Sequence, residues 1–291
     1  AELGLTASCR VSAGLIDAFA GALGVLGKFA GKPDRMARHM ALIAGTSSCV
    51  MTLAAEPGRL RGFWGPYYGT ILPGFWLTEG GQSATGALLD HIIRLHGAGG
   101  EPDAAMHGRI AERIRELRAV QDEPAPRLHV LPDFHGNRSP HADSHARGVV
   151  SGLTLDASFD SLCRLYWRSA VAIALGVRHI LETLNAHGHA IDTLHVTGGH
   201  TRNPLLMELY ADATGCTVVE PETDEAVLLG TAMVAAAACG CYPSLADAAM
   251  AMARPARQRE AAPERAARYE RDYRIFLEMH RHRQALDAIG Q

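Results

Sequence analysis

A strand, a pair of glycines and the start of a helix follow one another directly in residues 193–214, and this unit constrains the fold most strongly. Its first residues, TLHVT, are typical of a short buried strand. After the turn at Gly198 and Gly199, Asn203 can cap a helix and Pro204 can occupy its first position. Such a unit indicates an α/β fold in which a nucleotide can lie on bare backbone at a helix N-terminus.

A hairpin is predicted over residues 40–53, which read MALIAGTSSCVMTL. Two apolar runs flank a turn of small residues, as in paired antiparallel strands. The tip presents Gly45, Thr46 and Ser47, whose backbone N–H and hydroxyl groups can hold a phosphate. Without a partner motif, an ordinary polar turn remains the favoured interpretation.

A helix is predicted within residues 11–26, because Leu15, Phe19 and Leu23 recur at helical spacing. Asp17 lies near its N-terminus. From the pattern alone, Asp17 is best interpreted as a capping or first-turn acid that the helix dipole favours.

Glycines and small polar residues fill residues 78–86, TEGGQSATG, and a helical pattern begins at Ser83. We place Glu79 in the turn before this helix. A charged amphipathic helix over residues 103–120 follows, and we assign it to the surface.

The loop at residues 131–150 is rich in metal-binding side chains. These are Asp133, His135, His141, Asp143 and His145. Histidine and carboxylate are ligands of zinc and iron, so a metal site is one interpretation. However, Pro140 interrupts the run, and the spacing fits no helical pair of histidines. A structured loop, with Asn137 and Arg138 holding its turns, is the favoured interpretation.

The rest of the chain alternates helices and strands. Long helices are expected over residues 158–187, 225–238 and 263–289, with a short strand over 217–219. Neither a GxxxxGK[ST] phosphate loop nor a GxGxxG fingerprint occurs, so an ATP site in this chain needs another architecture.

Composition excludes several classes of function. The 291 residues are 47% hydrophobic and 20% charged, which is typical of a globular protein with a substantial core. A formal charge of −3 argues against nucleic acid as a partner. The six cysteines form no Cys-x-x-Cys pair, and no apolar run reaches the length of a membrane span. We therefore expect a cytoplasmic protein with reduced thiols and no membrane partner.

Four segments together resemble the FGGY carbohydrate kinases, and their order matches the C-terminal domain of that family. They are GLIDA at 14–18, AGTSS at 44–48, EGGQSATG at 79–86 and TGGHTRNP at 197–204. The resemblance implies an RNase H-like domain of the actin and hexokinase ATPase superfamily, with a mixed sheet and flanking helices. This domain is the second of the family's two.

The resemblance also implies roles for individual residues. Asp17 matches the catalytic base, which also contacts the sugar, and Glu79 resembles an acid that binds sugar hydroxyls. The remaining matched residues lie on the nucleotide side: Gly45, Thr46, Ser47, Gly86, Gly198, Gly199 and Asn203. Asp90 stands where some relatives carry a glutamine, so no role is assigned to it. ATP and Mg²⁺ are the implied cofactors, and no residue is assigned to the metal.

The segment DFHGNRSP at 133–140, with Arg147 and Gly148, looks most like the pentulose kinases. D-ribulose is the expected substrate, phosphorylated at its 5-position, with L-ribulose and D-xylulose as the next choices. Two alternatives remain. One is a non-catalytic nucleotide- or sugar-binding regulator on the same fold, and the other is a metal-dependent hydrolase built on His135, His141 and His145.

We expect the chain to be the second kinase domain, with residues 1–20 as a linker that carries Asp17. The first domain of the family, with most of the sugar contacts, has no counterpart in this sequence. The isolated chain is therefore expected to bind adenine nucleotide weakly and to leave pentulose unphosphorylated. Kinases of the family are often dimers, so the resemblance also admits a homodimer.

Overall fold

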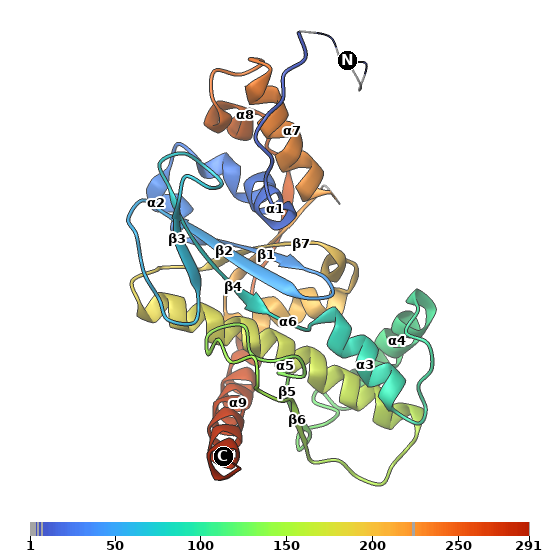
Figure 1. Ribbon diagram of the computed structural model, residues 1–291. Helices are drawn as coiled ribbons and strands as arrows, with labels where there is room; N and C mark the ends of the chain where they lie inside the picture. The colour runs from blue at the N-terminus through green and yellow to red at the C-terminus, as the bar shows by residue number, and fades with distance from the viewer. Residues whose placement is uncertain (1–3, 5, 7, 223–224, 291) are drawn as a thin grey trace.

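Seven strands form one mixed sheet, and helices flank it. The computed structural model describes residues 4, 6, 8–222 and 225–290. The helices α1, α2, α7 and α8 lie on one side of this sheet, and α5 and α6 lie on the other (Figure 1). The long helix α9 extends away from the sheet beyond α5 (Figure 1). This arrangement confirms the predicted mixed sheet with flanking helices.

The elements are bounded as follows. The strands are β1 (His39–Ala44), β2 (Ser48–Ala54), β3 (Trp64–Tyr68), β4 (Trp76–Gln82), β5 (His129–Leu131), β6 (Val149–Ser151), β7 (Thr193–Thr197), β8 (Thr217–Pro221) and β9 (Ala256–Arg259). The helices are α1 (Asp17–Leu26), α2 (Pro33–Met36), α3 (Gly86–Leu95), α4 (Ala104–Val120), α5 (Phe159–Ala186), α6 (Pro204–Thr214), α7 (Ala226–Ala238), α8 (Leu245–Ala251) and α9 (Pro263–Ile289), with short 3-10 turns η1 (Gly27–Phe29) and η2 (Gly199–Arg202).

The sheet has the order β3-β4-β2-β1-β7-β8-β9. The strands β1, β2 and β4 are antiparallel neighbours, as the predicted hairpin requires. The strands β1, β7 and β8 run parallel, with Leu42 opposite Val196. The carboxyl ends of β1 and β7 therefore meet at one edge of the sheet, and the glycine-rich turn after β7 lies beside the tip of the hairpin.

Both faces of the sheet are buried, which explains why its central strands read as continuous apolar runs. Along β1, Met40 and Leu42 belong to the core shared with α5, whereas Ala41 belongs to the core shared with α1. Burial of each large apolar side chain contributes roughly 1.5–3 kcal/mol. Both layers of helices are held on the sheet by this alternation.

The predicted helix starts are confirmed at two N-caps. Ser158 accepts a hydrogen bond from the backbone N–H of Ser161 at the start of α5. Asn203 accepts one from Leu205 at the start of α6, with Pro204 as the first helical residue. Each cap satisfies an N–H group that has no partner within its helix.

Glu79 lies within β4, so its predicted place in a turn is wrong. It pairs with Met51 of β2, and the strand continues through Gly80 and Gly81. A Cβ on Gly81 would lie 2.1 Å from the carbonyl oxygen of Ser48. Gly81 is therefore required because the backbone of β2 approaches closely. A Cβ on Gly80 would meet the Phe63 ring and the Ser139 hydroxyl at 2.9 Å.

Candidate functional site

A cavity of about 550 Å³ lies where the hairpin tip, the start of α3, the helix α4 and the turn after β7 meet. This volume is in the range of small-molecule binding sites. The lining residues are Gly45, Thr46, Gly86, Leu89, Asp90, Ala104, His107, Gly108, Ala111, Arg115, Tyr166, Gly199, His200, Arg202, Asn203, Pro204 and Leu206. Five of the residues predicted on the nucleotide side therefore share one cavity.

The carbonyl oxygen of Gly45 joins three parts of the cavity wall. It accepts hydrogen bonds from the Thr85 hydroxyl at 3.0 Å, from the Gly86 N–H at 3.0 Å and from the His200 ring at 2.9 Å. The carbonyl of Thr46 accepts from Thr85 and Ala87. The hairpin tip thus caps the N-terminus of α3, and this close approach requires Gly86, whose Cβ would lie 2.7 Å from the Gly45 oxygen.

The ring of His200 has a defined tautomer. A carbonyl oxygen can only accept, so Nε2 of His200 donates to Gly45, and Nδ1 accepts from the Tyr210 hydroxyl at 2.8 Å. Burial lowers the pKa of His200 to about 4, so the ring is neutral at pH 7. The histidine of the glycine-rich turn therefore positions the hairpin tip.

The fold requires glycine at only some of the glycine positions around the site. Gly198 has φ of 92°, and its Cβ would lie 2.5 Å from the Ala44 oxygen, so the fold itself requires glycine there. At Gly45, Gly108 and Gly199 no described atom other than the adjoining backbone lies within 4 Å of the Cβ position. None of these three has a positive φ, and all three line the cavity. Added side chains there would project into free space.

A row of hydrogen-bonded side chains, which the sequence pattern did not predict, runs along the cavity wall. His107 contacts the Asp90 carboxylate through Nε2 at 3.0 Å and the Tyr166 hydroxyl through Nδ1 at 2.9 Å. The carboxylate can only accept, so Nε2 donates to it. His107 belongs to α4, which is an amphipathic surface helix as predicted, and lies on the helix face that lines the cavity. Ile110 and Ile114 lie beside His107 on the inward side of α4 and are buried in the core.

Arginines add positive charge to the same wall. Arg202 is exposed and lines the cavity from η2, and Arg115 lines it from α4, where it also pairs with Glu112. Guanidinium groups bind phosphate oxygens well. Arg202 belongs to the TGGHTRNP segment, although no role was predicted for it, and Arg115 lies outside the four motifs.

Ser47 and Gly198 flank the cavity without lining it. Ser47 closes the hairpin turn, because its carbonyl accepts a hydrogen bond of 2.9 Å from the Gly45 N–H. Asn203 does line the cavity, and its Oδ1 accepts from the Leu205 N–H as the helix cap.

Asp17 is exposed at the first position of α1, and its Oδ1 accepts a hydrogen bond of 2.7 Å from the Ala18 N–H. This carboxylate lies at a helix N-terminus, where the dipole favours negative charge. It does not line the cavity.

Glu79 forms a partly buried ion pair with Arg138 of the 131–150 loop, at 2.7 Å. Burial raises the pKa of Glu79, and Arg138 opposes that rise. Arg138 also donates to the Cys49 sulfur and stacks over the Trp64 ring at 4.7 Å. This pair is separate from the cavity wall.

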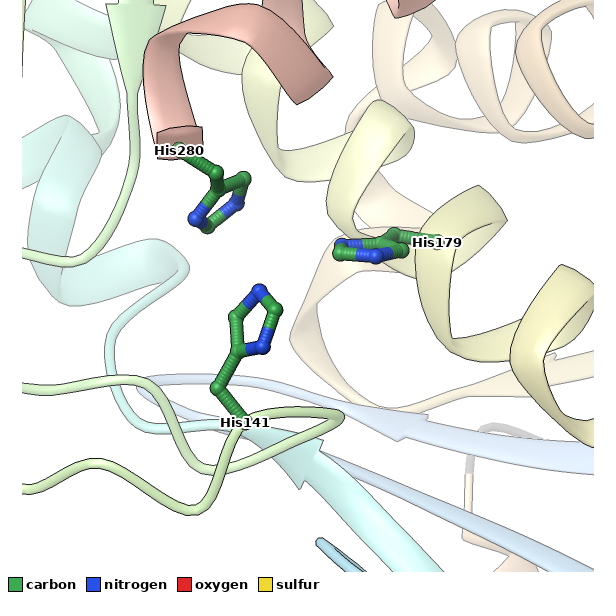
Figure 2. A group of neighbouring side chains, drawn as sticks. All are labelled: His141, His179 and His280. Atoms are coloured by element: carbon green, nitrogen blue, oxygen red, sulfur yellow. The ribbon is translucent and has the colours of Figure 1, made fainter. Parts of the chain in front are cut away.

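The 131–150 loop does not bring its own three histidines together. Among the described residues, His141 instead approaches His179 of α5 and His280 of α9 (Figure 2). Burial lowers the pKa of His179 to about 4 and that of His280 to about 3. The geometry on which a hydrolase would be built from His135, His141 and His145 is therefore not present.

Across the described residues, none of the helices combines the length and the apolar composition needed to cross a membrane.

Comparisons with known proteins agree with this architecture. Residues 40–239 match the FGGY family of carbohydrate kinases, C-terminal domain. An FGGY carbohydrate kinase domain-containing protein of Xenopus laevis is 42% identical, over 99% of this chain and 55% of the relative. A D-ribulokinase of Saccharomyces cerevisiae is 37% identical, over 81% of this chain and 37% of the relative. The chain spans about half, 55%, of the length of the Xenopus laevis protein and of a second FGGY carbohydrate kinase domain-containing protein, from Danio rerio.

The fold also matches solved structures. The crystal structure of a xylulose kinase from Rhodospirillum rubrum superposes with a TM-score of 0.72 at 25% identity, over 93% of this chain and 51% of that one.

Proposed function

The chain belongs to the FGGY family of carbohydrate kinases, and on that premise we propose that it forms the nucleotide-binding half of a pentulose kinase. In this proposal residues 1–20 are a linker that carries Asp17, and a further domain supplies most of the sugar contacts. ATP occupies the cavity, and the sugar lies towards Asp17 and Glu79. The active site is completed only where the two domains meet.

The observation that carries the proposal is the set of open glycines. Gly45, Gly108 and Gly199 border the cavity, and neither positive φ nor a neighbouring atom explains why each lacks a side chain. A ligand that lies directly on the backbone does explain it, because a Cβ would take up its space. The volume of about 550 Å³ suits a nucleotide.

Some polar groups of the cavity wall can bind the phosphates of ATP, and others can bind its adenosine. Thr46 is exposed at the hairpin tip, where its hydroxyl can donate to phosphate oxygens. Gly199 and Asn203 can accommodate the adenosine, and the side-chain amide of Asn203, which also hydrogen-bonds to Tyr166, keeps one further N–H donor after capping α6. Arg202 and Arg115 add positive charge that favours a polyphosphate.

Mg²⁺ would neutralise charge on the phosphates of bound ATP. The carboxylate that lines the cavity is Asp90, and His107 already donates to it. The residues of this chain thus fit the nucleotide better than they fit a dedicated metal cage. We propose that the ion arrives with ATP and that the further domain provides its carboxylate.

Asp17 acts as the general base. A sugar hydroxyl transfers its proton to the Asp17 carboxylate while its oxygen forms a bond to the γ-phosphorus, and the bond to the bridging oxygen breaks to release ADP. Such a base contributes about 10²–10⁴ in rate. Glu79 and Arg138 orient the sugar through its hydroxyl groups. The exposure of Asp17 at a helix N-terminus supports this role, because the carboxylate is free to receive a substrate.

D-ribulose is the proposed sugar, ahead of L-ribulose and D-xylulose. Relatives named D-ribulokinase, from Saccharomyces cerevisiae, and ribulokinase, from Mycolicibacterium smegmatis, are 37% and 33% identical to this chain. A structural neighbour is titled xylulose kinase, which keeps D-xylulose as a candidate.

The test has two parts. Isothermal titration calorimetry of this chain with ATP and Mg²⁺ is expected to give binding, and a coupled assay of the isolated chain with the three pentuloses is expected to give no turnover. The same assay on a protein that includes the further domain is expected to give the highest kcat/KM with D-ribulose. Absence of ATP binding, or robust turnover by the isolated chain, would contradict the proposal.

A further inference from the structure

Three histidines from distant parts of the sequence converge on one space, away from the cavity described above. His179 comes from α5, His280 from α9, and His141 from the loop that joins β5 to β6. One ring nitrogen of each lies within 4.8 Å of the other two. Figure 2 shows the three rings facing a common gap.

His280 has the environment of a metal ligand. Its side chain is 8% exposed, and its Nε2 is buried without a hydrogen-bond partner. Its Nδ1 faces the Asp133 carboxylate at 3.6 Å, and Asp133 in turn accepts from Asn137 at 3.0 Å. A histidine that binds a metal through one nitrogen commonly directs the other at a carboxylate, which orients the ring. A buried unpaired nitrogen is otherwise costly.

The other two rings are available in the same way. Across the described residues, the ring nitrogens of His141 and His179 form no hydrogen bond. His141 is exposed and His179 is half-buried, so an ion can reach the gap from the side of His141, and a water can complete its coordination.

We propose that His141, His179 and His280 bind one Zn²⁺ ion, with Asp133 hydrogen-bonded to the back of His280. Three imidazoles and a water make a tetrahedral zinc site with Zn–N distances of about 2.0–2.1 Å, so the nitrogens must come within about 3.4 Å of one another. The ring nitrogens now lie within 4.8 Å of one another, and side-chain rotation can shorten these distances, because the exposed ring of His141 has room to move.

The ion would fasten the loop to two helices. The same loop carries Arg138, which pairs with Glu79 of β4. Zinc would therefore hold this ion pair in place by tying the loop to α5 and α9. Zinc binding itself does not depend on the proposed nucleotide site, because none of the three histidines lines the cavity.

The competing explanation is packing alone. The rings of His179 and His280 also contact Phe276 edge-on, at centroid distances of 5.9 and 4.8 Å. A purely aromatic cluster would explain the contacts, but it leaves the buried Nε2 of His280 without a partner.

The experiment uses the purified chain after removal of metal with a chelator. Titration with ZnCl₂, followed by calorimetry and elemental analysis, is expected to give one tightly bound ion per chain. Zinc at 100 times its Kd is expected to raise the Tm by at least about 5 °C. His141→Ala is expected to weaken zinc binding at least 10-fold and to abolish most of this rise.

The control is His145→Ala, which removes an exposed histidine of the same loop. It is expected to bind zinc like the parent chain. Asp133→Asn is expected to lower zinc affinity about 10–100-fold while leaving a stoichiometry of one. The proposal is overturned if the parent chain binds no zinc, or if His141→Ala and His145→Ala bind it equally well. His141 is exposed, so its variant is expected to fold, and circular dichroism checks this.

Discussion

The Nε2–H of His200 donates a hydrogen bond of 2.9 Å to the carbonyl oxygen of Gly45. These residues are 155 positions apart, and each belongs to a different glycine-containing motif. The bond joins the turn after β7 to the tip of the β1–β2 hairpin, so the two motifs form one wall. It requires a neutral imidazole whose Nδ1 accepts from Tyr210.

This bond predicts a pH dependence of stability. Burial holds the pKa of His200 at about 4, below the ordinary 6.5, so the unfolded chain binds more protons between these values. Stability from this group is complete above pH 6.5 and falls as the pH drops towards 4. Between pH 7 and pH 5 the parent chain is expected to lose about 2 kcal/mol of unfolding free energy more than His200→Gln does.

Urea unfolding at both pH values measures that difference. Partial burial also lowers the pKa of the half-buried His39, to about 4, so only the comparison with the variant isolates His200. His135→Gln, at an exposed position, is the control. It is expected to lose as much unfolding free energy between pH 7 and pH 5 as the parent chain does. If the parent and His200→Gln lose the same unfolding free energy between pH 7 and pH 5, the His200 ring is accessible to protons in the folded chain and the prediction is wrong.

The open glycines predict the effect of filling the cavity. Gly108→Leu adds a side chain where no atom lies within 4 Å, and leucine favours a helix more than glycine by roughly 0.5–1 kcal/mol. We expect thermal stability to be kept or raised while ATP affinity falls at least 10-fold. Calorimetry with ATP and a melting curve measure both quantities. Gly97→Leu also enters open space, but outside the cavity, and should leave ATP affinity unchanged.

Asp17→Asn tests the proposed base. Asparagine keeps the shape and can still accept a hydrogen bond at the start of α1, but it cannot take the proton. In a protein that includes the further domain, kcat with D-ribulose is expected to fall about 10²–10⁴-fold with little change in the KM for ATP. Asp34→Asn, at the start of α2, changes another exposed first-turn acid and should be silent. Unchanged kcat in Asp17→Asn would favour a non-catalytic regulator.

Glu79→Gln tests the proposed sugar side. The change removes the charge that pairs with Arg138 but preserves size, so the loop keeps its packing. We expect the KM for the pentulose to rise at least 10-fold and ATP binding to stay within twofold of the parent. An equal loss of ATP affinity would place Glu79 on the nucleotide side, against the proposal.

Asp272→Ala tests how α9 is held on α5. Arg168 is 2% exposed and bonds to the fully buried Asp272 at 2.8 Å, so the variant leaves a buried guanidinium without its main partner. The free energy of unfolding is expected to fall by about 3–5 kcal/mol in denaturant titrations. Glu270→Ala removes an exposed acid of the same helix that pairs with Arg178, and should cost about 1 kcal/mol or less.

Local sequence patterns were sufficient to predict most of the helices and strands and, with the motif match, five residues that line the cavity. The hairpin at β1 and β2, the capped start of α6 at Asn203 and the alternation of helices and strands all follow from signals between near neighbours. Such signals predict well because backbone geometry at a turn or a cap depends on a few adjacent residues. The motif match then brought Gly45, Gly86 and Gly199 into one hypothesis.

Assembly in space could not be derived in this way. The helix α4 carries charges typical of a surface helix, yet His107 of α4 joins Asp90 and Tyr166 in the cavity wall. Glu79 lies in a strand because β4 pairs with β2, and His141 meets His179 and His280 rather than its neighbours in sequence. In each case the partners are separated by many residues, and their contact depends on how helices pack on both faces of the sheet, which no local pattern encodes.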